Sequence, residues 1–234
     1  LKFMSLKLLA IDTSTEACSA ALLYHQAIQE RYQLAPRQHS QLILPMMQSL
    51  LDEAGLKLND LDALAFTRGP GSFTGIRIAA SIIQASALVA DLPVVLVSSL
   101  QCLAQGAYRE FQAEQVLAAM DARMDEIFFA SYSLDNKAIM RECDAEQLID
   151  ARQLQSISLN SFVGVGSAWD KYPEILASQF KLQLQRWYPQ RYPSAYEVAL
   201  IAADAYQGGE FVSAAEALPT YLRETVAVRR GSDG

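Results

Sequence analysis

The segment 69–77, Gly-Pro-Gly-Ser-Phe-Thr-Gly-Ile-Arg, has the residue types of a binding loop. Its glycines and proline force a tight turn, and Ser72 offers a side-chain oxygen that can cap the helix that follows. Backbone N–H groups at such a strand–turn–helix junction favour an anion, which makes Gly71 and Ser72 candidate phosphate contacts. The spacing matches neither a Walker A loop, because no Gly-Lys-Ser/Thr follows, nor GxGxxG, because Thr74 replaces the last glycine. The segment is therefore either a phosphate-binding loop or a plain structural corner.

Two aspartates end apolar segments that are alike. Asp12 ends the run 6–12 and Asp121 ends the run 116–121, and a short polar turn follows each of them. In two-lobed phosphotransferases such carboxylates face one another across a cleft and organise Mg²⁺ and nucleotide. Asp12, Ser14 in the first turn, and Asp121 are therefore candidate nucleotide contacts. The alternative is that each aspartate caps its own hairpin turn.

Histidines and cysteines give no convincing catalytic or metal site. His25 and His39 are the only histidines, and a site built on histidine usually needs two or three converging ligands. The three cysteines are far apart and form no CxxC pair, which favours reduced thiols over a zinc site or a disulfide framework. No Ser/His/Asp arrangement stands out. The sequence thus predicts neither catalytic residues nor a metal site.

The composition excludes some classes of partner. The net charge is −7, and the only basic pair is Arg229-Arg230, so the chain is a poor nucleic-acid binder on its own. Charged residues make up 19% of the chain, which is somewhat low and indicates that a partner covers part of the surface. We expect no signal peptide and no apolar run long enough to span a membrane, and hence a cytoplasmic location.

The elements that must position these residues follow from the apolar periodicity. Strands are expected at 6–12, 18–24, 61–66 and 93–97, and helices at 38–54, 76–90 and 98–108. In the second half, strands are expected at 116–121, 127–133 and 162–165, and a helix at 196–207. Gly55 should end the helix 38–54 as a C-cap.

The two halves share one pattern. Asp12 and Asp121 lie 109 positions apart, and both stand in the order strand, aspartate, short turn, strand. A repeat of this kind predicts an α/β fold with two similar lobes. We expect an N-terminal lobe at 4–104 and a C-terminal lobe at 105–230, with the last segment, 218–230, packing back on the first lobe.

Two expected helices of the first half are unusually apolar. The helix 38–54 has a wide apolar face that includes Met46 and Met47. The helix 76–90 carries no charge after Arg77 until Asp91 and is rich in small residues. It is either buried between its own sheet and neighbouring helices or, together with the methionine side of the first helix, part of a subunit interface.

Four segments resemble the motifs of the TsaB (YeaZ) family, bacterial proteins needed for threonylcarbamoyladenosine in tRNA. They are Ile-Asp-Thr-Ser at 11–14, Arg-Gln-His-Ser at 37–40, the glycine junction at 69–77 and Pro-Thr-Tyr-Leu-Arg at 219–223. The resemblance extends from Met4 to about Arg230. It implies the two-lobed fold of the actin-like ATPase, sugar kinase and Hsp70 superfamily, which is ribonuclease H-like.

The resemblance also implies kinship with TsaD, the catalytic subunit that transfers threonylcarbamoyl from an adenylate to N6 of adenosine 37 in ANN-decoding tRNAs. TsaD carries an HxxxH metal motif, and the corresponding positions here are 99–103, Ser-Leu-Gln-Cys-Leu. The hydroxyl of Ser99 and the isobutyl group of Leu103 do not replace two imidazoles as metal ligands. We therefore expect a non-catalytic subunit with no cofactor of its own, in a complex whose ATP and metal belong with TsaD.

By the same resemblance, TsaB proteins pair with TsaD through the helices of the first lobe, reach TsaE through that pair, and can pair with themselves. The tRNA is then an indirect partner. The residues expected at this interface are Leu42, Met46, Met47, Leu50, Phe73, Ile76, Arg77, Ala80 and Ile83. A glutamate at Ala80 or Ile83 is expected to abolish pairing and to leave the monomer folded.

Two other functions compete with this one. A free-standing ATP-dependent kinase or ATPase of the same fold would use Asp12, Asp121 and the glycine junction as its nucleotide cleft. It would also need a glycine-rich adenosine loop in the second lobe, where only Gly164-Val-Gly166 and Gly208-Gly209 are available. A metallopeptidase is the third reading, and the missing histidine pair argues against it.

Overall fold

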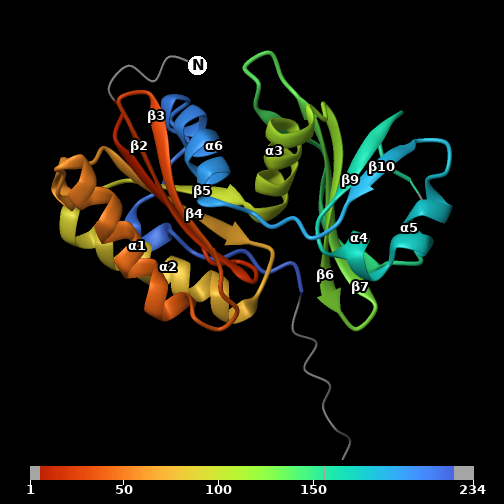
Figure 1. Cartoon of the computed structure of the whole chain (residues 1–234), viewed down its shortest axis with the longest axis horizontal. Helices are drawn as coiled ribbons and strands as arrows, with labels where there is room; N and C mark the ends of the chain where they lie inside the picture. Colours follow the sequence, from red (N-terminus) through yellow and green to blue (C-terminus); the bar gives the residue numbers. More distant parts are fainter. Residues whose placement is uncertain (1–5, 155, 224–234) are drawn as a thin grey trace, which may run out of the picture.

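Two five-stranded sheets form the centres of two lobes (Figure 1). The computed structural model describes residues 6–154 and 156–223. The strand order of the first sheet is β3-β2-β1-β4-β5 and that of the second is β10-β9-β6-β7-β8. Read from its own first strand, each sheet has the same order, third-second-first-fourth-fifth. The duplicated α/β architecture predicted from the sequence is therefore confirmed.

The first sheet begins with an antiparallel meander, and two parallel strands complete it. β1 pairs antiparallel with β2, β2 pairs antiparallel with β3, and β1 pairs parallel with β4, which pairs parallel with β5. The strands are β1 (Leu8–Asp12), β2 (Ala17–Tyr24), β3 (Ala27–Leu34), β4 (Ala63–Gly69) and β5 (Val94–Ser98).

The second sheet repeats these relations strand for strand. β6 pairs antiparallel with β7, β7 pairs antiparallel with β8, and β6 pairs parallel with β9, which pairs parallel with β10. The strands are β6 (Gln115–Arg123), β7 (Glu126–Leu134), β8 (Met140–Asp150), β9 (Phe162–Val165) and β10 (Leu184–Tyr188).

Helices cover both faces of the first sheet. α1 (His39–Ala54) and α2 (Phe73–Ala90) pack on the face to which Leu9 and Ile11 point. α6 (Ala195–Gln207) packs on the opposite face, where the alternate β1 residue Leu8 lies. Because successive strand residues point to opposite faces and both faces are covered, the residues of β1 from Leu8 to Ile11 are all apolar. The short 3₁₀ helices η1 (Leu58–Asp60) and η2 (Ala214–Glu216) complete this lobe.

The second lobe has shorter helices. α3 (Ser99–Phe111) covers one face of the second sheet, and α4 (Ala168–Lys171) and α5 (Pro173–Gln179) cover the other. Trp169 is the largest buried side chain of this second core. A methyl group at Gly164 would collide with the Trp169 ring, so a glycine is required at this point of β9.

The chain crosses between the lobes by exchanging two helices. α3 follows the first sheet but packs on the second, and α6 follows the second sheet but packs on the first. The expected boundary at 104/105 falls inside α3, and the return to the first lobe begins at Ala195 rather than at 218. In the final segment, Thr220 N–H donates to the Arg68 carbonyl at 2.8 Å. Residues 224–230 lie outside the described part of the chain.

α2 departs from one expectation. By length and composition alone it is apolar enough to cross a membrane, although no such run was expected from the sequence. In the folded chain, Gly75, Ile76, Ala79, Ala80, Ile83 and Ala87 form a buried stripe that packs into the first core. A core helix with one further apolar face accounts for this composition.

Candidate functional site

The glycine junction is closed by the turn that follows β1. Ser72 N–H donates to the Ser14 carbonyl at 2.7 Å, and the Thr13 hydroxyl donates to the Gly75 carbonyl at 2.7 Å. A methyl group at Gly71 or Gly75 would collide with a carbonyl oxygen of that turn. The glycines therefore permit close backbone approach.

The start of α2 is satisfied within the chain. The Ser72 hydroxyl caps the helix by accepting from Gly75 N–H at 3.3 Å, as the sequence predicts. Ser72 N–H, which would face a phosphate, is already bonded to the first turn. Of the two readings of segment 69–77, this geometry favours the structural corner over phosphate contact by Gly71 and Ser72.

Asp12 is wholly buried beneath the same turn. Its Oδ1 accepts from the Ser14 hydroxyl at 2.7 Å and from the Thr67 hydroxyl at 2.5 Å, and Oδ2 has no hydrogen-bond partner among the residues that the structure describes. Burial raises the pKa of Asp12 to about 6, although these hydrogen bonds and the nearby His39 oppose the rise. Asp12 and Ser14 thus form a turn-capping pair with no exposed surface.

Asp121, at the matching position of the second lobe, has a different environment. Its carboxylate accepts from Lys171 Nζ at 3.0 and 3.2 Å and lies 3.5 Å from the Tyr172 hydroxyl. Its backbone N–H donates to Ser167 Oγ at 3.0 Å. Among the described residues, Asp12 and Asp121 share no hydrogen-bond partner, so neither carboxylate orients the other through a common group.

A cavity of about 370 Å³ lies between β3, α3 and the segment that leads into α6. Neither aspartate lines it. Three carboxylates and two guanidiniums do, and they are Glu30, Glu110, Glu197, Arg109 and Arg191. The excess of negative charge is the opposite of what a triphosphate requires. This cavity gives the kinase reading no support.

The two positions that the family resemblance aligns with the TsaD histidine pair, Ser99 and Leu103, lie at the start of α3. Ser99 and Leu103 are both buried, and Leu103 belongs to the core beneath the second sheet. In the described part of the chain, no three His, Cys, Asp or Glu side chains gather into a group that would hold a metal ion.

The predicted interface residues divide into two groups. Five of them are buried in the first core and offer no surface to a partner, which corrects the prediction: Met47, Leu50, Ile76, Ala80 and Ile83. Leu42 and Met46 are half-buried, and Phe73 and Arg77 are exposed. For the same reason, glutamate at Ala80 or Ile83 would place a charge in the core, so these variants do not test pairing.

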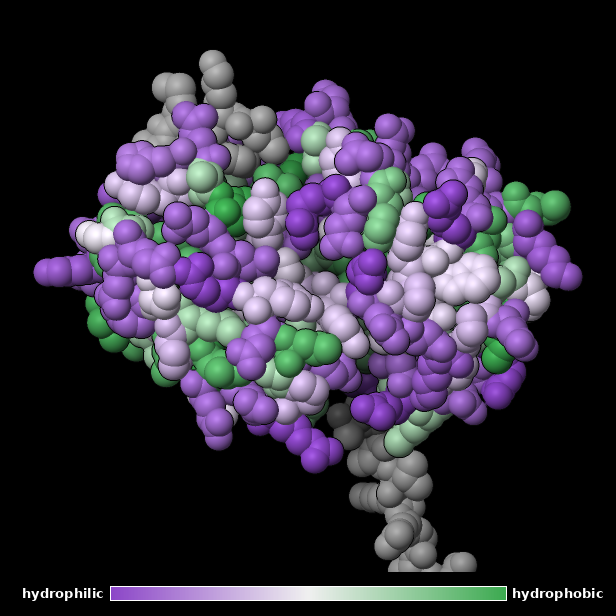
Figure 2. Space-filling model, viewed as in Figure 1, coloured by the Kyte–Doolittle hydropathy of each residue, from purple (hydrophilic) through white to green (hydrophobic). Residues whose placement is uncertain are grey.

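The outer face of α1 and α2 carries apolar residues that the prediction missed. Leu44 on α1 and Leu88 and Val89 on α2 are more than half exposed, and Ile78 and Ile82 are half-buried. Figure 2 shows hydrophobic side chains gathered on the side of the molecule where Figure 1 places α1 and α2. Exposed apolar residues grouped in this way are typical of protein–protein contact sites.

An arginine–aromatic cluster extends this face to the end of the described chain. The Arg77 guanidinium lies 3.7 Å from the centre of the Phe73 ring, and its Nε donates to the Tyr221 hydroxyl at 2.8 Å. Both rings are about half exposed. The segments 69–77 and 219–223 both carry the family resemblance, and the sequence predicted that the last segment returns to the first lobe but not that these two segments meet.

Comparison with known proteins agrees with this architecture. The profile of the family described as TsaD, tRNA N6-adenosine threonylcarbamoyltransferase, matches residues 26–227. The chain is 41% identical to the tRNA threonylcarbamoyladenosine biosynthesis protein TsaB of Escherichia coli K12, over 96% of this chain and 98% of that one. It is 40% identical to the TsaB protein of Haemophilus influenzae, over 97% of both chains.

A solved structure matches the whole fold. The structure of YeaZ from Pseudomonas aeruginosa superposes with a TM-score of 0.85 at 40% identity, covering 93% of this chain and 100% of that one. The two duplicated sheets, their shared strand order and this match identify the fold as the two-lobed actin-like fold. The chain therefore belongs to the TsaB (YeaZ) family, whose members are kin of TsaD.

Proposed function

We propose that this chain is a non-catalytic partner subunit of the bacterial tRNA threonylcarbamoyladenosine synthase. It pairs with TsaD and, through that pair, with TsaE, and so supports threonylcarbamoyl transfer to adenosine 37 of ANN-decoding tRNAs. Family membership ties the chain to the biosynthesis of this nucleoside. The subunit role and the partners are the proposal.

One observation carries the non-catalytic role. The chain matches the TsaD profile over residues 26–227, and the family resemblance aligns Ser99 and Leu103 with the metal-binding histidines of TsaD. Both side chains are buried, so neither presents a donor atom to a solvent-accessible site. A chain that has the TsaD scaffold but lacks its metal ligands is consistent with a subunit that binds the catalytic subunit and does not itself catalyse the transfer.

The outer face of α1 and α2 supports the pairing. Its half-buried residues Leu42, Met46, Ile78 and Ile82 lie beside exposed positions that are small or apolar, such as Ala85 and Leu88. Small side chains let a partner helix approach closely, and methionine adapts to the partner's shape. A second copy of this chain would occupy the same face when TsaD is absent.

The remaining assignments follow from this role. The chain holds no cofactor of its own, and the ATP and the metal of the complex are held with TsaD. Because the net charge is −7, its contact with tRNA is indirect. There is no membrane partner, and the complex works in the cytoplasm, where its tRNA is found.

Reconstitution tests the role directly. Threonylcarbamoyladenosine formation is measured with purified TsaC, TsaD, TsaE, tRNA, ATP, threonine and bicarbonate, with and without this chain. We expect the modified nucleoside only when the chain is present. A yield that does not depend on the chain contradicts the proposal, and tight ATP binding by the isolated chain would favour the kinase reading instead.

The pairing surface is tested with a matched pair of glutamates. Ala85→Glu puts a charge on the exposed face of α2, and Leu182→Glu puts the same charge on a fully exposed position of the second lobe. We expect Ala85→Glu to weaken TsaD binding at least tenfold, about 1.4 kcal/mol, because the charge is desolvated at the interface. Leu182→Glu should bind normally. Equal binding by both would place the interface elsewhere.

A further inference from the structure

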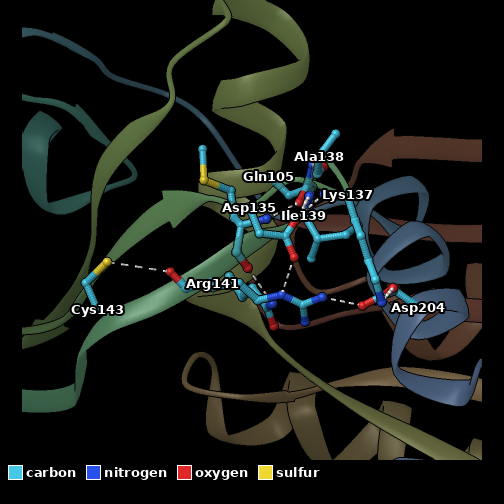
Figure 3. Close-up of polar contacts among 10 residues, drawn as sticks. Gln105, Asp135, Lys137, Ala138, Ile139, Arg141, Cys143 and Asp204 are labelled. Carbon is cyan, nitrogen blue, oxygen red and sulfur yellow. Dashed lines mark hydrogen bonds and ion pairs between the residues drawn. The ribbon is translucent and has the colours of Figure 1, made fainter. Parts of the chain in front are cut away.

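The turn between β7 and β8 reaches from the second lobe to α6, which packs on the first sheet (Figure 3). Asp204 on α6 has a side chain that is only 4% exposed. Lys137 Nζ lies 2.9 Å from its Oδ1, and the Arg141 guanidinium pairs with its Oδ2. A buried carboxylate of one lobe is therefore neutralised by two cations of the other.

The turn that carries Lys137 and leads to Arg141 at the start of β8 is itself held in shape. Asp135 Oδ1 accepts from the N–H groups of Lys137 at 2.8 Å and Ile139 at 2.9 Å, and its Oδ2 accepts from Arg141 Nε at 2.8 Å. Figure 3 shows Arg141 lying between Asp135 and Asp204. Burial alone would raise the pKa of Asp204, but the hydrogen bonds and charges of Lys137 and Arg141 hold it below its usual value.

α3 fixes the same turn from the other side. The side chain of Gln105, which is buried, donates from Nε2 to the Ala138 carbonyl at 3.0 Å and accepts at Oε1 from Met140 N–H at 2.8 Å. Gln101 Nε2 donates to the Met140 carbonyl at 2.8 Å. The turn and α3 thus form one unit within the second lobe.

α6 presents a second buried acid to that unit. Glu197 lies seven residues before Asp204, about two helical turns, so both carboxylates project from one face of α6. Arg109 of α3 donates from Nε to Glu197 Oε1 at 2.5 Å, and the Ser194 hydroxyl donates to Oε2. Two buried acids on one helix of the first lobe therefore meet three cations of the second.

A separate bridge joins the sheets directly. Arg68, near the end of β4, places Nη1 3.1 Å from Oε2 of Glu146 on β8, and the Glu146 side chain is 7% exposed. The final described residue, Arg223, donates to the Ala122 carbonyl at 3.0 Å and pairs with Glu126. Charged contacts thus link the lobes at several separate places.

We propose that these contacts, which we call the interlobe clasp (Arg109, Lys137, Arg141, Glu197, Asp204, and the Arg68–Glu146 bridge), lock the two lobes at one fixed angle. Two-lobed proteins commonly close around a ligand by hinge motion. Here a change of angle would break buried, charge-assisted hydrogen bonds at several points together. The chain then acts as a rigid body, whether or not nucleotide or a partner is present.

The test measures the interlobe distance in the full-length chain. Spin labels are placed at exposed positions on each lobe through Gln48→Cys on α1 and Leu182→Cys before β10, in a Cys143→Ser background. Pulsed electron paramagnetic resonance should give one narrow distance distribution that Mg-ATP leaves unchanged. A broad distribution, or one that shifts with Mg-ATP, overturns the proposal.

A charge-removal series identifies the clasp as the cause. Lys137→Gln with Arg141→Gln removes the two cations that bind Asp204 to the second lobe, so we expect the distribution to broaden at least twofold. Adding Asp204→Asn removes the stranded charge but does not restore the interlobe contacts, so the distribution should stay broad. Arg152→Gln, which breaks two surface ion pairs within the second lobe, is the matched control and should change nothing.

The series also separates the clasp from general destabilisation. A broadened distribution that Asp204→Asn narrows again would mean that a stranded charge, rather than the lost contacts, loosens the lobes, and would contradict the clasp. An unchanged distribution in Lys137→Gln with Arg141→Gln would contradict it as well. If that variant does not fold, the wild-type distribution with and without Mg-ATP decides alone. Diluting the doubly labelled chain with unlabelled chain leaves only distances within one molecule, and none of these measurements involves TsaD, so the outcome is independent of the proposed function.

Discussion

The two lobes have the same sheet but not the same covering. Each has five strands in one order, yet the first carries the long helices α1 and α2 on its outer face, and the second carries only α4 and α5 there. Between β8 and β9, where α1 would have its counterpart, the described residues form no helix. The second lobe, which has no long helices on its outer face, therefore also has no broad apolar face for a partner in its described residues.

The two cores are built from different side chains as a result. Between the first sheet and its outer helices lie mostly aliphatic residues, whereas the matching layer of the second lobe is filled by Phe162, Trp169 and Phe180. These large aromatic rings fill the space that the side chains of a longer helix would otherwise occupy. The comparison teaches that a shared sheet can serve either as a platform for interface helices or as a closed packing unit.

The largest effect is expected from a charge inside the first core. Ile83→Glu buries a carboxylate with no cation beside it, which should lower the free energy of unfolding by about 4–5 kcal/mol. Ser81→Glu, on the exposed side of the same helix, should stay within about 0.5 kcal/mol of the wild type. Urea unfolding followed by circular dichroism measures both. Similar losses for the two variants would mean that α2 does not pack by this face.

The second-lobe core gives the next largest effect. Trp169→Ala removes its largest buried side chain and should cost about 3–5 kcal/mol, because the short helices around it collapse only partly. Trp187→Ala, at a 40% exposed position stacked on Trp169, should cost clearly less. The difference is measured by urea denaturation at matched protein concentration. Equal losses would show that the aromatic cluster is not the organising core of this lobe.

The smallest and most pH-dependent effect on stability is expected from the two aspartates at matching positions, Asp12 and Asp121. The pKa of Asp12 is raised from 3.8 to about 6, so ionising it destabilises the folded chain fully above pH 6 and not at all below about 4. Asp12→Asn should therefore stabilise the chain at pH 7 by up to about 3 kcal/mol, and this gain should disappear as the pH falls through 6 towards 4.

Asp121→Asn is the control for that experiment. It removes only an ion pair with the partly exposed Lys171, so its effect should stay within about 1 kcal/mol. Thermal unfolding of both variants between pH 4 and 7.5 makes the comparison. A constant difference between Asp12→Asn and the wild type across this range would mean that Asp12 is not buried in its charged form.

Much of the fold was predictable because apolar periodicity is strong in the core elements. The hairpin around Asp12, both long helices and the Gly55 cap followed from residue types, and the described chain has them in place. β3, β8 and β10 were missed. Their residues are largely half-buried or exposed, so polar side chains interrupt the run that marks a buried strand.

The candidate site was predictable only in part, for a different reason. An apolar helical face shows that residues are withdrawn from water, but it does not show whether the sheet or a partner covers them. Leu50 and Ile83 are covered by the chain's own core, whereas Leu88, left out of the prediction, is exposed. The burial of Asp12 and the meeting of Arg77 with Tyr221 depend on contacts between distant segments, which one sequence does not encode in its local pattern.

The exchange of α3 and α6 between the lobes constrains the order in which the chain can fold during its synthesis. The inner face of the first sheet is covered by α6, and Ala195 N–H bonds to Ser19 Oγ across 176 positions of the chain. During synthesis, α6 emerges only after almost the entire polypeptide. Until then, the apolar side chains on that face are exposed to solvent or to a chaperone. The elements of the first lobe are not contiguous in the chain, and a fragment that ends after β5 would lack the helix that closes its sheet.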